Sequence, residues 1–292
     1  MTNKGFLKLN KSTFNLRFKI LQNLNLRIIF QLLIFLFLSN IIFAQIPDST
    51  NKKSDLKNSI GVSLGLSDFH VRDEMASPLT YRGTGITGCL EYKRKGEKSI
   101  HTAGLSGYYD ILTTNFAKYD AENYRVGFRY NYLHRISELS IFKNNFKIYV
   151  GGGVYSFLNY SHYKEYISKI ELINVPWYWS HSAEFSFLFD YFISHSNHVT
   201  LQFYLPIISN VSRPAYSSFG RELNRVGVVK LFGVMAPFWK NPNVQINVGF
   251  NYRINTWLKI FAQYNFQYAS YSEPRKVAMY MNNLRTGTKF LF

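Results

Sequence analysis

Apolar and polar residues alternate with a period of two along most of the chain from Ser59 onward. Residues 244–254 alternate without a break: apolar side chains occupy one face, and the other face holds Gln245, Asn247, Gly249, Asn251 and Arg253. The same pattern recurs in residues 258–268, 124–132 and 199–205. Strict alternation predicts β-strands with one apolar and one polar face.

The length of these strands favours a membrane barrel over a soluble sandwich. They run for about 9 to 13 residues, whereas soluble strands peak near 5 to 6 and a tilted membrane strand needs about 9 to 11. Tyrosines cluster near the ends of the apolar faces, as an aromatic girdle does, at Tyr124, Tyr130, Tyr132, Tyr252 and Tyr268. An open sheet edge cannot lie in hydrocarbon with unpaired amides. The pattern therefore predicts an all-β fold, an antiparallel up-and-down transmembrane β-barrel over residues 59–292.

The strand count follows from the same pattern. Eleven segments are predicted as strands: 59–71, 82–94, 98–113, 121–136, 145–160, 177–193, 197–209, 223–238, 243–254, 257–270 and 284–292. Bacterial barrels use even numbers, with short turns on one side and long loops on the other. We therefore expect one more strand within 163–176 or 210–240. The prediction is twelve strands, with ten as the alternative.

The N-terminus has the features of an export signal. Residues 1–27 carry six cations and no acid, and about 16 mostly apolar residues follow, ending in Phe43-Ala44-Gln45. That run is shorter than a membrane-spanning helix. We expect a signal peptide over 1–44, cleaved after Ala44, and a flexible periplasmic lead over 45–58. The sequence Phe-Ala-Gln resembles the signal-peptide ends of exported Bacteroidota proteins.

The C-terminal strand carries the most specific motif. Its sequence resembles the signal by which bacterial outer-membrane barrels are recognised for assembly, with the key positions filled by Arg285, Gly287, Phe290 and Phe292. The whole mature chain thus resembles the broad class of Bacteroidota-type outer-membrane β-barrel proteins. This resemblance implies the outer membrane of a Gram-negative bacterium and contact with the barrel-assembly machinery. It implies no particular activity.

Composition narrows the choice of partners. The chain holds 26 Phe, 22 Tyr and 4 Trp, and its formal net charge is +17. An exported protein does not routinely meet nucleic acid, so outer-membrane lipids and lipopolysaccharide are the expected counter-charges. The single Cys89 excludes an internal disulfide framework and a multi-cysteine metal site, and no cofactor is expected.

Alternation also predicts which charges face the lumen. The inward cations are Arg125, Arg129, Arg253, Lys259, Arg285 and Lys289, and the inward acids are Glu91, Glu184 and Asp190. In a narrow barrel these charges pair and fill the interior. In a wider one the positive lining favours a small, porin-like diffusion channel for anionic or hydrophobic solutes.

Two further hypotheses concern activity and partners. A lipid-modifying hydrolase needs a serine beside a general base, and in Ser194-His195-Ser196-Asn197-His198 adjacent residues point to opposite faces. A non-enzymatic structural or binding protein of the cell envelope is therefore favoured. Trp177 and Trp179 are either an interfacial belt or an outer-loop platform for a glycan or an envelope protein partner.

Overall fold

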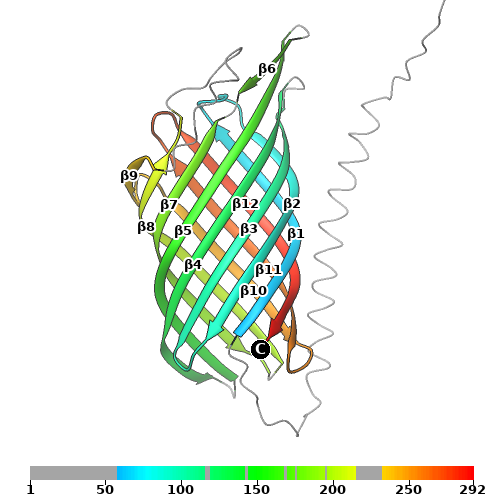
Figure 1. Cartoon of the computed structure of the whole chain (residues 1–292), viewed down its shortest axis with the longest axis vertical. Helices are drawn as coiled ribbons and strands as arrows, with labels where there is room; N and C mark the ends of the chain where they lie inside the picture. The colour runs from blue at the N-terminus through cyan, green and yellow to red at the C-terminus, as the bar shows by residue number, and fades with distance from the viewer. Residues whose placement is uncertain are drawn as a thin grey trace, which may run out of the picture. The chain divides into compact units, whose positions relative to one another are not determined.

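The computed structural model describes residues 58–115, 119–141, 144–167, 170–174, 176–194, 196–214 and 232–292. The strands are β1 (Asn58–Asp73), β2 (Tyr81–Lys95), β3 (Ser99–Thr113), β4 (Tyr119–Ile141), β5 (Asn144–Ile167), β6 (Ile170–Asn174), β7 (Trp177–Phe192), β8 (Asn197–Ser212), β9 (Val234–Pro237), β10 (Asn243–Arg253), β11 (Leu258–Tyr271) and β12 (Val277–Leu291) (Figure 1). No helix among the described residues is long and apolar enough to span a membrane. The predicted signal peptide, and all of the predicted lead except Asn58, lie outside the described residues.

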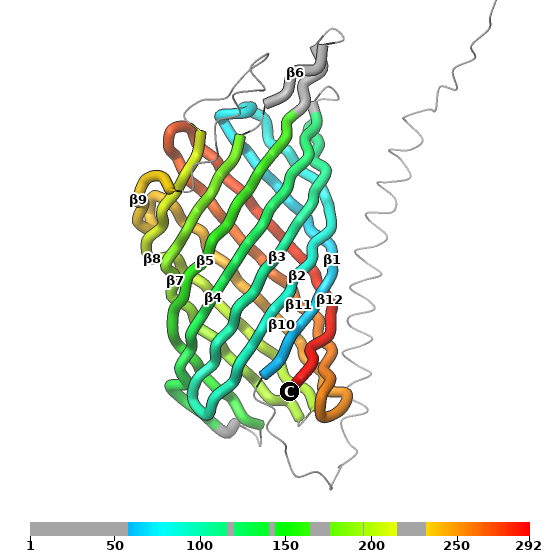
Figure 2. Tube along the Cα trace, viewed as in Figure 1, coloured from blue at the N-terminus to red at the C-terminus, as the bar shows by residue number. Residues whose placement is uncertain are grey.

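The strands form a closed antiparallel ring, which confirms the predicted barrel (Figures 1 and 2). The order around the ring is β10, β11, β12, β1, β2, β3, β4, β5, β7 and β8, and β8 pairs with β10 to complete it. The first and last strands are neighbours: the backbones of Asn58 and Phe292 exchange two hydrogen bonds of 2.9 Å. Closure gives every strand of the ring a partner on both sides, as hydrocarbon requires.

The ring contains ten strands, so the preferred prediction of a twelve-stranded barrel is corrected to its alternative. Strand β6 lies where an extra strand was expected, but it pairs only with the overrunning end of β5. Strand β9 pairs with residues 208–211 of β8, directly beyond the segment of β8 that pairs with β10. Strands β9 and β10 are therefore successive pieces on the same side of β8. The predicted strand 223–238 lies largely outside the described residues.

The two ends of the barrel differ in their connections. One end of the barrel, here the turn end, carries the short connections between β2 and β3, β4 and β5, β7 and β8, and β10 and β11. The first strand of the ring, β1, begins at this end, and the last strand, β12, ends there. The opposite end, here the loop end, carries the longer connections. In bacterial barrels the short turns face the periplasm and the long loops face outward.

The barrel wall is polar on its inner face and apolar on its outer face, which is the reverse of a soluble protein. Along β1 the serines at 59, 63 and 67 are buried inside, while Ile60, Val62, Leu64 and Leu66 are exposed outside. Leu64 is the most exposed of these, at 71%. Exposed apolar residues recur around the ring, with Tyr92 and Phe290 near the turn end and Tyr124 and Tyr280 near the loop end. This is the surface of a transmembrane barrel with aromatic girdles.

Candidate functional site

A fully buried ion pair fills one side of the lumen. Arg125 Nη2 on β4 lies 2.6 Å from Asp110 Oδ2 on β3, and neither side chain is exposed. Ser67 Oγ on β1 donates a hydrogen bond to the other carboxylate oxygen. The guanidinium carbon lies 4.0 Å from the ring centroid of Phe69 and 4.5 Å from that of Tyr108. The guanidinium charge is thus held by a carboxylate and two aromatic faces, and the hydroxyl of Ser67 supports the carboxylate.

A second arginine crosses the middle of the lumen. Arg129 Nε on β4 lies 2.9 Å from Glu184 Oε2 on β7, and its Nη1 donates to Gln245 Oε1 on β10 over 2.5 Å. Its guanidinium carbon lies 3.9 Å from the ring centroids of both Tyr155 and Tyr204. Strands β4, β7 and β10 are not neighbours in the ring, so this cluster, here the Arg129 layer, connects opposite parts of the wall.

Amide side chains fill the interior beside β10, β11 and β12. Asn283 Nδ2 donates to Asn265 Oδ1 over 3.0 Å, and Asn265 in turn donates to Asn247. Gln267 Nε2 donates to Asn243 Oδ1 over 2.7 Å. These hydrogen bonds replace water for part of each amide, while Asn243 Nδ2 and Asn283 Oδ1 have no hydrogen-bond partner among the residues that the structure describes. Together with the Arg129 layer, they make the central lumen a packed polar core.

An apolar cluster closes the lumen beyond this core, at the loop end. Its buried members, here the apolar cap, include Phe69, Val71, Tyr81, Leu112, Phe157, Tyr163, Tyr178, Val211, Val277, Met279 and Met281. At the end of β1, Arg213 Nη2 lies 2.7 Å from Asp73 Oδ1. The sequence interpretation missed this cap, whose signal was the change to apolar residues at inward positions at the ends of β1 and β12.

The remaining inward charges lie closer to the turn end. Lys289 Nζ on β12 lies 2.9 Å from Glu91 Oε1 on β2, and Lys259 on β11 is the cross-strand partner of Lys289. Asp190 is buried on β7. Arg253 instead donates through Nε and Nη2 to the carbonyl oxygens of residues 255 and 256, and so caps the β10–β11 turn. The predicted lumen set thus divides between the core and the turn end.

The predicted assembly motif lies along the seam between β12 and β1. The Arg285 side chain is buried and its Nη2 donates to Gln263 Oε1 over 3.1 Å, while Phe290 and Phe292 are exposed on the outside. A Cβ atom added at Gly287 would lie 2.1 Å from the Val62 carbonyl oxygen of β1. Glycine at 287 therefore permits the close approach of the two terminal strands.

The two tryptophans proposed as a platform do not share one exposed surface. Trp177 is only 4% exposed. Trp179 is half-buried, and its Nε1 donates to Ser156 Oγ over 3.1 Å. Its ring centroid lies 5.1 Å from that of His181. His195 of the proposed histidine–serine motif lies outside the described residues, and His198 stacks on Phe192 at 5.3 Å.

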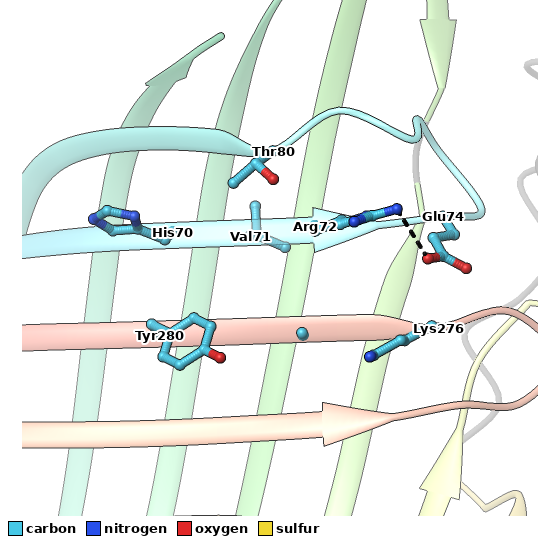
Figure 3. Close-up of a pocket in the computed structure, with 8 residues that line it drawn as sticks. His70, Val71, Arg72, Glu74, Thr80, Lys276 and Tyr280 are labelled. Atoms are coloured by element: carbon cyan, nitrogen blue, oxygen red, sulfur yellow. Dashed lines mark ion pairs between the residues drawn. The ribbon is translucent and has the colours of Figure 1, made fainter.

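A polar pocket interrupts the outer apolar wall beside β1 and β12 (Figure 3). It is lined by His70, Val71, Arg72, Glu74, Thr80, Lys276, Ala278 and Tyr280. Arg72 Nη2 lies 3.4 Å from Glu74 Oε1. Next to the pocket, Asp68 accepts from His70 Nε2 at 3.3 Å and lies 3.7 Å from Arg82 Nε. On the outward face of β1, the side chains thus change from apolar, up to Leu66, to polar toward the loop end.

Comparison with known proteins adds the following. No family model and no curated protein matches this chain. The outer-membrane protease OmpT from Escherichia coli is similar with a TM-score of 0.46 and 8% identity, over 84% of this chain and 99% of that one. The translocator domain of autotransporter NalP from Neisseria meningitidis has a TM-score of 0.39 and 10% identity, over 84% and 90%. Ail of Yersinia pestis has a TM-score of 0.33 and 10% identity, over 80% and 99%.

Similarities this weak carry no information on ligand or activity. The Bacteroidota origin and the cleavage after Ala44 stay predictions. The candidate sites therefore rest on the geometry of this chain: a filled lumen and a polar pocket on the outer wall.

Proposed function

We propose that this chain is an integral protein of a Gram-negative outer membrane whose lumen does not conduct and whose role is binding at the cell envelope. The Arg129 layer is the observation that supports this best. It joins β4, β7 and β10 through one guanidinium group, and the apolar cap lies beyond it toward the loop end. Solute would have to displace two packed layers in series, which argues against a diffusion channel.

We further propose the outer-wall pocket as the binding site, with the phosphorylated glycolipid of the outer leaflet as its ligand. Arg72, Arg82 and Lys276 place cations on or beside lipid-facing positions at the loop end, where lipid phosphates lie. In the described residues, the hydrogen-bond partner of His70 is the carboxylate of Asp68 rather than a hydroxyl. That arrangement suits charge recognition better than activation of a nucleophile.

Planar-bilayer recording tests the closed lumen. We expect the purified chain, shown to be inserted by co-flotation with liposomes, to give no single-channel steps. Regular steps from the inserted chain would overturn the non-conducting proposal and restore the channel.

Native mass spectrometry in detergent tests the ligand. We expect added lipopolysaccharide to give a 1:1 adduct that Arg72→Gln with Lys276→Gln weakens about tenfold. Lys240→Gln, which removes a cation paired with Glu273 outside the pocket, is the matched control. Equal binding by the double variant and the control would exclude this pocket.

A further inference from the structure

The turn end of the lumen gathers lysines from three strands. Lys93 and Lys95 come from β2, Lys259 from β11 and Lys289 from β12, and together they are here the lysine cluster. The register brings three of the lysines to one place: Lys259 pairs with Lys289, Lys289 pairs with Gly61 of β1, and Lys93 pairs with Ser59 two residues away. Three strands and the intervening β1 thus present one basic surface to the interior.

Small residues on β1 make room for these long side chains. The inward positions of β1 near the turn end are Ser59, Gly61, Ser63 and Gly65. A Cβ atom added at Gly61 would already lie 3.2 Å from Lys289 Cγ. The Lys289 side chain therefore lies over Gly61, where a larger residue would collide with it.

One carboxylate, that of Glu91, offsets only part of the positive charge of this lysine cluster, and it attracts Lys93 as well as Lys289. Lys289 is paired with Glu91, but Lys93 and Lys259 form no ion pair with any residue in the described part of the chain. Lys93, Lys95, Arg253 and Lys289 all repel Lys259. Like charges at directly opposed positions, such as Lys259 and Lys289, destabilise a sheet. Such an arrangement calls for an anion from outside the chain.

The lysine cluster is accessible to solvent at the turn end. Lys95 is exposed, and Lys93, Lys259 and Lys289 are half-buried, so solvent reaches them from the turn end. On the other side, the Arg129 layer and the apolar cap close the lumen. A ligand therefore enters and leaves by the same mouth, which faces the periplasm when the short turns do.

We propose that this lysine cluster binds a small phosphate-bearing anion, either inorganic phosphate or a phosphate monoester. Lysine ammonium groups are compact point charges that recognise phosphate, and a dianion offsets both Lys93 and Lys259. The ring of strands limits the size of the ligand. The proposed phosphate site lies at the turn end of the barrel, whereas the outer-wall pocket lies at the loop end. The phosphate site therefore does not depend on the glycolipid proposal.

Isothermal titration of the folded barrel in zwitterionic detergent tests this site, with inorganic phosphate, glucose 6-phosphate and a hexaglutamate peptide as probes. We expect one saturable phosphate site that weakens with salt. Lys259→Gln and Lys93→Gln each weaken it at least tenfold, and Lys259→Arg retains it. Lys240→Gln, which removes a cation outside both proposed binding sites, is the control for loss of one charge. Tighter binding of glucose 6-phosphate than of inorganic phosphate identifies a monoester as the ligand, and the reverse identifies free phosphate.

Heat-modifiable gel mobility shows that each variant is folded. Absence of a saturable phosphate site, or equal affinity in Lys259→Gln and Lys240→Gln, would overturn the proposal. Preferential binding of the peptide would overturn it in favour of an acidic protein segment.

Discussion

Arg125 on β4 and Asp110 on β3 form an ion pair of 2.6 Å in which both side chains are fully shielded from solvent. Removing one member of a buried pair leaves an uncompensated charge and costs about 3–5 kcal/mol, whereas replacing both by apolar residues is often nearly neutral. We expect Asp110→Ala to lower the free energy of unfolding by about that amount. Urea unfolding in lipid vesicles, followed by tryptophan fluorescence, measures it.

The matched control for this pair is the double variant Arg125→Met with Asp110→Leu, which removes both charges. We expect it to recover most of the stability lost in Asp110→Ala. If the double variant is as unstable as the single one, the pair contributes through its specific geometry, and the desolvation argument fails.

Alternation predicted the side of the wall for Arg125, Arg129 and Glu184, because side-chain direction in a strand has a period of two. It did not identify Asp110, since the inward and outward residues of β3 differ little in polarity. The alternation also did not predict that apolar residues at the loop ends of β1 and β12 fill the inside of the barrel. Phe69 and Met279 point into the barrel. From the sequence alone they would be assigned to the lipid-facing side, because lipid was the only apolar environment considered.

Register and strand number depend on information that no single strand carries. The alignment of Lys259 with Lys289 follows from how β11 and β12 pair. The count of ten follows from β9 and β10 sharing one side of β8 and from β6 pairing only with β5. Both are properties of the closed ring. A pattern along the chain can list candidate strands but cannot decide which of them pair on both sides.

The apolar cap should behave as a hydrophobic core. Phe157 is fully buried, with its ring 5.9 Å from Tyr155 and 6.2 Å from Tyr178. We expect Phe157→Ala to destabilise the barrel by about 3–5 kcal/mol in the same urea assay. Phe128→Ala, which truncates an exposed phenylalanine on the outer wall, is the control and should cost clearly less. Equal losses would mean that the cap is not a packed core.

The outer wall should reject charge according to depth. Leu64 lies within the apolar run of β1, and Asp68 lies four residues nearer the loop end, where polar residues begin. We expect Leu64→Lys to cost about 2–4 kcal/mol in vesicles and Asp68→Lys about 0–1 kcal/mol. Unfolding in vesicles of defined thickness measures both. A smaller penalty at 64 than at 68 would place the hydrocarbon layer elsewhere on the barrel.

The seam between β12 and β1 should be sensitive to a single methyl group at Gly287. A Cβ atom there meets the Val62 carbonyl oxygen at 2.1 Å and the Ser63 Cα at 2.7 Å, so Gly287→Ala must push the two strands apart. Overpacking of this kind costs about 1–3 kcal/mol. Because this seam joins the first and last strands, we also expect slower folding into vesicles, seen as delayed appearance of the heat-modifiable gel band. Gly107→Ala is the matched control, since a Cβ atom there has no heavy atom within 4 Å. Equal folding rates and stabilities for the two variants would show that close approach at Gly287 does not limit barrel closure.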